Sequence, residues 1–239
     1  MSLAEEISRH FLVAIIRGTE NKEEALASVR AMYEGGIRVL EIPASTPGVM
    51  SLIEGIRAIM PTDLIVGVGT VLDPETARSA LLAGAQFVLC PTLRAETISL
   101  TKRYGAVIIP GAMTPTEILQ AYELGADMVK VFPAGSLGPQ YIRDIHGPLP
   151  KIPLMPTGGV NVKNIADYVR AGAAAAGLGS SLYQPGAGKN EQQLQELLDR
   201  SRDFVSEVMQ ARQTLRRGNN ENYRIQNICS AAPLAFFEN

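Results

Sequence analysis

A lysine and a glutamate each interrupt a run of apolar residues. Lys130 lies in DMVKVFPAG and Glu41 lies in GIRVLEIP. Such runs are typical of buried strands, where a lysine is rare unless it is paired or used in chemistry. Burial lowers the pKa of a lysine, and the free amine that results can attack a ketone and form a Schiff base. A nearby carboxylate can then move protons, so this pair of residue types predicts carbonyl chemistry.

A buried ion pair between Lys130 and Glu41 is the structural alternative. Such a pair contributes little net stability, because desolvation offsets much of the attraction between the charges. Lowering the pKa of a lysine to about 7–8 costs on the order of 4 kcal/mol. We expect catalysis to be the reason for that cost, provided that the fold brings the two side chains together.

A repeated sequence pattern predicts the helices and strands that position these residues. Five times a helical pattern ends in glycine and an apolar strand pattern follows, as in YEGGIRVLEI and YELGADMVKV. Glycine is typical of the left-handed residue that ends a helix. Alternating helices and strands predict βα units around a parallel sheet. The five glycines are Gly36, Gly84, Gly105, Gly125 and Gly172.

Filling the wider gaps between these repeats gives eight βα units. We therefore expect an α/β fold, a (β/α)8 barrel of the TIM type with an N-terminal helix, over residues 1–214. An open doubly wound sheet is the alternative, but its usual GxGxxG turn is missing from IIRGTENKEEA. Residues 215–239 form an extension of unknown role, in which GNNEN suggests a flexible link and APLAFF an apolar docking segment. The predicted strands lie near 11–17, 37–42, 64–69, 85–90, 106–110, 127–132, 152–156 and 174–178. The predicted helices lie near 21–35, 48–60, 74–83, 95–104, 114–124, 138–146, 161–171 and 189–213.

Glu41 and Lys130 hold equivalent places in this repeat. Each lies five residues after a leading glycine, Gly36 or Gly125. Alternate residues of a barrel strand point inward, and the second and sixth strands face each other across an eight-stranded barrel. Both side chains should therefore converge at the C-terminal face of the barrel, where active sites of this fold lie.

Glycine-rich loops follow the seventh and eighth predicted strands, in PTGGV and GLGSS. Loops at these two places form the usual phosphate site of such barrels, because their backbone N–H groups surround the anion. The candidate ligands are Gly158, Gly159, Gly179 and Ser180.

Other candidate residues end the remaining strands. Arg17 ends the first strand in AIIRG and is expected to point inward, where it would suit a carboxylate or phosphate; a surface position is the alternative. Thr70 ends the third strand and either donates a hydrogen bond to substrate or caps the next helix. Phe132 should point inward from the strand of Lys130. Cys90 is expected to be a small core residue rather than a reactive thiol.

Composition excludes several other functions. The net charge is −2 and no basic run occurs, so nucleic acid is not an expected partner. Apolar runs such as FLVAII are too short to span a membrane. Two cysteines in 239 residues indicate a reduced, cytoplasmic compartment. The only histidines, His10 and His146, lie outside the strand ends, so we expect neither a serine triad nor a His-ligated metal. We also expect no cofactor.

The chain resembles the 2-keto-3-deoxy-6-phosphogluconate aldolases, a family that includes 4-hydroxy-2-oxoglutarate aldolase and 6-phosphogalactonate relatives. The resemblance runs from about residue 10 to 213 and implies a metal-independent class I aldolase on a (β/α)8 barrel, usually a trimer. It implies that Lys130 is the Schiff-base lysine and Glu41 the acid and base. It also implies that Thr70 and Arg17 bind the pyruvoyl end, that Phe132 packs beside it, and that Gly158, Gly159 and Ser180 bind phosphate. The motifs are AIIRG, GIRVLEIP, GVGTVLDP, IIPGAMTPTE, MVKVFPA, LGPQYI, PTGGVN and GLGSSL.

One position departs from part of the family. Some members carry an arginine for the pyruvate carboxylate four residues after the glutamate, where this chain has Ser45. In members with a similar motif an arginine ends the first strand, so the resemblance gives this role to Arg17.

The expected reaction is cleavage of a 2-keto-3-deoxy-6-phospho sugar acid to pyruvate and glyceraldehyde 3-phosphate. The alternatives are a 4-hydroxy-2-oxoglutarate aldolase, a phosphate-binding isomerase or epimerase with Glu41 as base, and a non-catalytic sugar-phosphate binder. Borohydride separates the last two from an aldolase, because neither forms a Schiff base.

Overall fold

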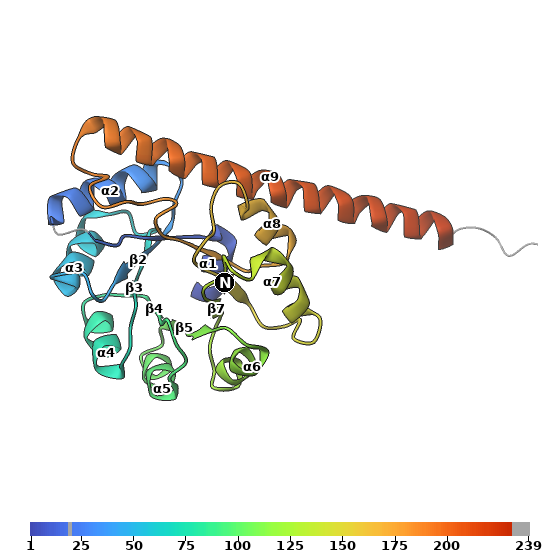
Figure 1. The fold of residues 1–239 in the computed structure, drawn as a ribbon, viewed down its shortest axis with the longest axis horizontal. Coiled ribbons are helices and arrows are strands. Elements are labelled where there is room, and N and C mark those ends of the chain that lie inside the picture. The colour runs from blue at the N-terminus through green and yellow to red at the C-terminus, as the bar shows by residue number, and fades with distance from the viewer. Residues whose placement is uncertain (19–20, 231–239) are drawn as a thin grey trace, which may run out of the picture.

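Helices and strands alternate through the computed structural model, which describes residues 1–18 and 21–230, with side chains as far as residue 217. Figure 1 shows helices α2 to α8 arranged in chain order around the strands. The helices are α1 Leu3–His10, α2 Lys22–Glu34, α3 Val49–Ile59, α4 Pro74–Leu82, α5 Ala95–Arg103, α6 Pro115–Glu123, α7 Gly138–His146, α8 Ile165–Arg170 and α9 Glu191–Ser230. The strands are β1 Leu12–Ile15, β2 Val39–Pro43, β3 Ile65–Gly69, β4 Phe87–Leu89, β5 Val107–Ile109, β6 Gly111–Ala112, β7 Val129–Val131, β8 Leu154–Pro156 and β9 Ala176–Leu178.

The helix ends follow the predicted signals. All five repeated glycines have positive φ, between 71° at Gly105 and 100° at Gly36, which confirms their left-handed role. Asp73 caps α4, and Thr114 forms a capping box with Glu117 at the start of α6. The glycine repeat is therefore a repeat of helix endings, each leading into a buried strand.

The strands form two parallel sheets. One has the order β5-β4-β3-β2-β1-β9 and the other the order β6-β7-β8. Only Pro110 separates β5 from β6, because proline has no N–H to contribute to the ladder. A parallel bridge between Thr157 and Gly177 joins the end of β8 to β9. The predicted α/β class is confirmed, and the larger sheet forms a parallel half-barrel.

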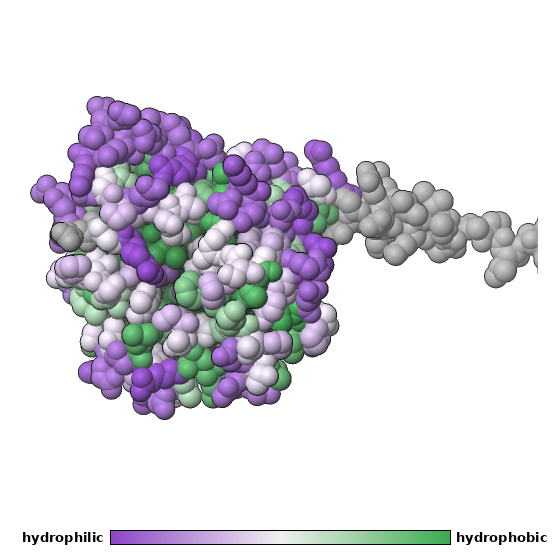
Figure 2. Space-filling view, in the orientation of Figure 1, coloured by the Kyte–Doolittle hydropathy of each residue, from purple (hydrophilic) through white to green (hydrophobic). Residues whose placement is uncertain are grey.

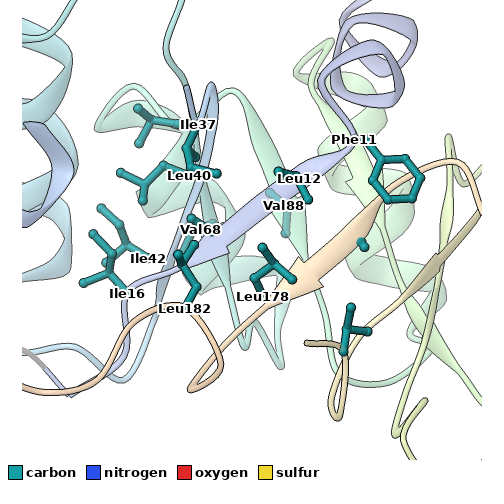
Figure 3. Close-up of a cluster of buried hydrophobic side chains, with 14 of the residues drawn as sticks. Phe11, Leu12, Ile16, Ile37, Leu40, Ile42, Val68, Val88, Leu178 and Leu182 are labelled. Carbon is teal, nitrogen blue, oxygen red and sulfur yellow. The ribbon is translucent and has the colours of Figure 1, made fainter. Parts of the chain in front are cut away.

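Apolar side chains form two separate clusters on the two faces of the strands. The outer cluster lies between strands and helices and includes Leu40 and Ile42 of β2 (Figure 3). The inner cluster takes alternate residues, so that Val39 belongs to it while Leu40 does not. The inner cluster consists of Ile7, Val13, Val39, Ile65, Phe87, Leu89, Val107, Ile109, Met128, Met155 and Ala175.

Helix α1 covers one end of this inner cluster. Its Ile7 is fully buried there. Arg212 of α9 holds the end of α1 from outside, because its guanidinium donates to the carbonyls of Ser8 and Arg9 and lies over the ring of Phe11. The N-terminal end of the strands is thereby closed by packing, which leaves the C-terminal end for a site.

Helix α9 packs against α2 and α8 and then runs beyond them (Figure 1). The expected flexible link at GNNEN is wrong, since the helix continues through it to Ser230. A single glycine in a helix costs only about 1 kcal/mol, which its flanking residues can offset. The APLAFF segment lies outside the described residues. In the part of the chain that is described, no helix is long and apolar enough to cross a membrane.

Among the boundaries that differ from the prediction, two lie beside candidate site residues. β1 ends at Ile15, so Arg17 lies beyond the strand with an exposed side chain instead of pointing inward from its last residue. Gly18 has a φ of 78° and turns the chain there. α8 begins at Ile165 instead of 161, because the segment before it forms side-chain turns at two asparagines.

Candidate active site

Lys130 is the middle residue of β7. It is paired with Gly111 of β6 on one side and Met155 of β8 on the other. Met128, two residues earlier, belongs to the inner cluster, so Lys130 points to the same face. Its side chain is 5% exposed, and Nζ lies 4.9 Å from the centre of the Phe132 ring. The predicted burial of this lysine within a strand is confirmed.

Glu41 lies in β2 between Ile15 of β1 and Gly67 of β3. It is 0% exposed, and neither carboxylate oxygen has a hydrogen-bond partner among the described residues. Buried polar atoms in folded proteins are nearly always paired, so two unpaired oxygens on one carboxylate indicate a functional group.

Gly69 makes room for this carboxylate. A Cβ atom added at Gly69 would lie 1.6 Å from Oε1 of Glu41 and 2.1 Å from Cδ. Any larger residue would have to displace the glutamate side chain. The glycine in GVGTV therefore serves the position of Glu41 across the β2–β3 pair rather than a turn.

Burial dominates the protonation of both groups. Desolvation raises the pKa of Glu41, while the charges of Lys130 and Arg17 oppose that rise. Desolvation also lowers the pKa of Lys130, and the charge of Glu41 opposes that fall. Among the described side chains no ion pair joins the two. The direct ion pair of the structural alternative is thus not formed, and burial shifts the lysine toward its neutral form.

Arg17 and Thr70 follow β1 and β3, the two strands that pair with the strand of Glu41. Arg17 is exposed, yet its charge lowers the pKa of both Glu41 and Lys130, which places it within electrostatic reach. Thr70 has a φ of 56°, a strained value for a β-branched residue. Asp73 caps α4 by accepting from the Thr76 N–H at 2.6 Å, so the capping alternative for Thr70 is wrong.

The Gly158–Gly159 loop after β8 has an unusual backbone. Both residues have positive φ, 83° and 79°. A Cβ atom on Gly159 would lie 2.5 Å from Cα of Gly135, so glycine is required for close approach as well as conformation. Neither backbone N–H donates to any described group. Consecutive free N–H groups in such a turn form an anion-binding concavity.

The turn after β9 supplies the other two candidates. Leu182 and Tyr183 donate backbone N–H groups to the carbonyl of Gly179, each at 3.0 Å. Ser180 is exposed, and a Cβ atom on Gly179 would meet nothing within 4 Å. Arg200 of α9 donates to the carbonyl of Leu182 at 2.8 Å and holds the far end of the turn.

Three polar residues near these loops were not predicted. Thr157 is buried with an unpaired hydroxyl and lies over the inward face of Gly177, whose added Cβ would be 2.4 Å from Oγ1. Asn161 and Asn164 both donate side-chain amides to the carbonyl of Gly159. The threonine adjoins the PTGGV motif, but nothing in sequence spacing indicates that an asparagine turns back toward the glycines.

Phe132 and Cys90 complete the surroundings of Lys130. Phe132 is 43% exposed, and a hollow of about 340 Å³ opens beside it over the ends of β4 and β6. A larger hollow of about 740 Å³ lies between α4 and α5 on the outer surface and has no residue in common with this site. Burial raises the pKa of Cys90 to about 12, which confirms a core residue rather than a reactive thiol.

The described residues at this site do not form a metal-binding cluster. Within the described part of the chain, no cluster of three or more His, Cys, Asp or Glu residues could hold a metal ion. The groups gathered at the C-terminal end of the strands are instead an amine with a lowered pKa, an unpaired carboxylate and free backbone donors. They define an enzyme equipped for covalent chemistry on a carbonyl compound.

Comparison with known proteins agrees with this chemistry. The family model described as KDPG and KHG aldolase matches residues 4–197. The 2-dehydro-3-deoxy-6-phosphogalactonate aldolase of Escherichia coli is 39% identical over 176 residues, which cover 73% of this chain and 85% of that protein. The chain belongs to the KDPG and KHG aldolase family, and it is an aldolase, a carbon–carbon lyase.

Solved structures extend the comparison. KDPG aldolase from Legionella pneumophila, with pyruvate captured as a covalent carbinolamine intermediate, is 26% identical with a TM-score of 0.74 over 88% of this chain and 98% of that one. A cube-shaped protein cage designed by fusing symmetric oligomeric domains is 32% identical with a TM-score of 0.84 over 92% of this chain and 79% of that one.

Proposed function

We propose that the chain is a class I aldolase that cleaves a 2-keto-3-deoxy-6-phospho sugar acid to pyruvate and glyceraldehyde 3-phosphate. One observation carries the proposal. A lysine whose pKa is lowered by burial shares the interior with a glutamate whose two oxygens have no described partner. A fold gains no stability from that arrangement, whereas Schiff-base chemistry needs both groups.

The proposed mechanism begins when the Lys130 amine attacks the C2 ketone and forms a carbinolamine. Glu41, directly or through water, delivers the proton with which the C2 oxygen leaves as water, and an iminium remains. The carboxylate then accepts the C4 hydroxyl proton, and the C3–C4 electron pair moves into the iminium. Glyceraldehyde 3-phosphate departs, and hydrolysis of the enamine releases pyruvate and the free amine. The raised pKa of Glu41 suits a group that must both give and take a proton.

The proposal includes a closed (β/α)8 barrel. The inner cluster supports it, because residues of β1, β2, β3, β4, β5 and β8 and the residues that lead into β7 and β9 belong to one apolar interior. The bridge from Thr157 to Gly177 and the short break at Pro110 supply the two joints between the sheets. In such a barrel β2 and β7 lie on opposite sides, so Glu41 and Lys130 converge on the axis.

We assign the two ends of the substrate to opposite parts of the C-terminal end of the barrel. Arg17 would bind the carboxylate of the pyruvoyl end, because Ser45 stands where some family members carry an arginine for it. Thr70 would donate a hydrogen bond to the same end. Phe132 would pack beside the ketone, because its ring already lies next to Nζ of Lys130. The strained φ of Thr70 and the charge of Arg17 near the pair support these roles.

The phosphate is assigned to the backbone N–H groups of Gly158, Gly159, Gly179 and Ser180. The free donors at both loops and the positive φ of the two consecutive glycines support this subsite. The first substrate to test is 2-dehydro-3-deoxy-6-phosphogalactonate, because the Escherichia coli relative is named for it. The gluconate epimer is the matched comparison.

We also propose a homotrimer in the cytoplasm, with residues 1–214 as the catalytic domain and 215–239 as an extension. Figure 2 shows hydrophilic residues on the first part of α9, as far as residue 217, and hydrophobic patches over the lower half of the view, where α4, α5 and α6 lie. Leu82 at the end of α4, Leu119 in α6 and Leu72 just before α4 are exposed and suit contact with other copies. Sedimentation would test the trimer, and removal of residues 215–239 would test the domain boundary.

Borohydride reduction in the presence of pyruvate is the decisive experiment. A pyruvate-derived mass increment that peptide mapping places on Lys130 supports the proposal. A folded protein that binds sugar phosphates but gains no adduct contradicts it and favours an isomerase or a binder. Cleavage of the phosphorylated sugar acid, followed by release of pyruvate, then distinguishes an aldolase from a protein that only forms the imine.

A further inference from the structure

Asn164 stands at the start of α8 but does not cap it. It occupies the N-cap position, yet its side chain makes no capping hydrogen bond to the helix. Asn190 shows the usual behaviour at the start of α9, because its side-chain oxygen accepts from the Gln193 N–H at 2.9 Å. The side chain of Asn164 therefore serves something other than its own helix.

The amide of Asn164 turns back to the loop after β8. Its nitrogen donates to the Gly159 carbonyl at 2.9 Å, and its oxygen accepts from the Asn161 N–H at 2.8 Å. The Asn161 amide donates to the same carbonyl at 3.2 Å. One carbonyl thus accepts from two side chains, and Asn164 ties it to the backbone two residues farther along.

That carbonyl belongs to the segment proposed to bind phosphate. The C=O and N–H groups of a trans peptide unit point in opposite directions, so an anchored Gly159 carbonyl also fixes the direction of the Val160 N–H. The N–H groups of Gly158, Gly159 and Val160 donate to no described group. Two consecutive glycines would otherwise give this segment wide conformational freedom.

We propose that Asn164 is a positioning residue of the phosphate subsite, which holds the Gly158–Gly159 loop in the arrangement that directs its N–H groups at the anion. This inference rests on the proposed function, because it assumes that an anion binds at this loop. Asn164 acts behind the loop, since its described hydrogen bonds go to the backbone of residues 159 and 161.

The test compares a phosphorylated with an unphosphorylated substrate. Asn164→Ala is assayed for condensation of pyruvate with D-glyceraldehyde 3-phosphate and with D-glyceraldehyde. We expect kcat/KM for the phosphorylated aldehyde to fall about tenfold or more, through KM, because the Gly159 carbonyl keeps only the longer hydrogen bond from Asn161 and no longer holds the loop in place. The value for D-glyceraldehyde should stay within about twofold. Asn190→Ala removes a comparable asparagine hydrogen bond at the start of α9 and should change kcat/KM for neither aldehyde.

Each other outcome has a definite meaning. Equal losses on both aldehydes, or no loss on either, would overturn the positioning role. Asn164→Asp keeps the acceptor but not the donor and replaces the alanine variant if that one does not fold. Calorimetry with inorganic phosphate measures the subsite without a Schiff base. If wild-type protein binds phosphate and Asn164→Ala does not, while borohydride traps no pyruvate in either, then the aldolase proposal fails and the positioning role stands.

Discussion

The two ends of the proposed substrate meet two differently built regions. At the ketone end, Lys130 and Glu41 are buried side chains of strand residues, one in each of the two sheets. At the phosphate end, the proposed donors are backbone N–H groups of two glycine-rich loops, in which Asn164 and Arg200 donate to backbone carbonyls. Reactive groups are thus placed by rigid strands, and recognition groups by loops that need separate support.

This difference follows from what each end requires. A buried lysine has a lowered pKa and therefore carries more of the nucleophilic free amine at neutral pH than an exposed one. A phosphate keeps its charge and needs several short hydrogen bonds, which backbone N–H groups give without a side chain to desolvate. Damage at the ketone end should therefore abolish catalysis, while damage at the phosphate end should weaken binding of one class of substrate.

Lys130→Met should have the largest effect. It removes the nucleophile but retains an apolar side chain of similar length, so kcat should fall by at least about 10⁴-fold. Borohydride with pyruvate should leave the variant's mass unchanged. Binding of inorganic phosphate by calorimetry should persist and serves as the control for folding. Residual aldol cleavage above about one per cent of wild type would remove the Schiff-base assignment.

Glu41→Gln should lower kcat by about 10² to 10⁴-fold, the usual contribution of a positioned acid or base. It also removes the negative charge that opposes the fall in the pKa of Lys130. The pKa of the lysine should therefore fall further, and the rise of borohydride trapping with pH should move to lower pH than in wild type. A rise at higher pH would show that Glu41 does not act on Lys130 in this way.

Gly69→Ala tests whether the close packing of Glu41 on Gly69 matters for catalysis, and Gly55→Ala is its matched control. Gly55 lies in α3, where a Cβ atom would meet only the flexible side chain of Lys22, at 3.0 Å. Gly69→Ala, by contrast, must move the Glu41 carboxylate. If both substitutions left kcat unchanged, the close packing of Glu41 on Gly69 would have no part in catalysis.

Much of this arrangement could be predicted from the sequence because it depends on short periods. The glycine repeat located the helix ends, and strand alternation placed Glu41 and Lys130 on the inner face. The end of β1 at Ile15, two residues before Arg17, could not be predicted, because an apolar run does not show where pairing stops. The hydrogen bond from Asn164 to the Gly159 carbonyl could not be predicted either, since the direction in which an asparagine amide turns depends on the loop around it.

Gly159→Ala should have a smaller and more selective effect. The added methyl group would meet Gly135 at 2.5 Å and oppose a φ of 79°, so the loop must shift. We expect kcat/KM for the phosphorylated aldehyde to fall about 10- to 100-fold, as expected for misplaced binding groups. Borohydride trapping of pyruvate on Lys130 should be retained. Loss of trapping would mean that the two regions are not separable.

The smallest effect should be one on stability. Glu41 has a raised pKa, so its ionised form destabilises the fold and stability falls as pH rises through that pKa. Lys130 has a lowered pKa, so its ammonium form destabilises the fold until pH exceeds the ordinary lysine value. The double variant Glu41→Gln, Lys130→Met removes both destabilising charges.

We expect the double variant to be inactive but more stable than wild type at neutral pH, by at least about 1 kcal/mol in denaturant titrations. Lys130→Met alone should be less stable than the double variant, because it leaves Glu41 without its neighbouring cation. A double variant less stable than wild type would mean that the pair supports the fold. The ketone end would then still be more buried than the phosphate end. It would not, however, be maintained for catalysis at the expense of stability.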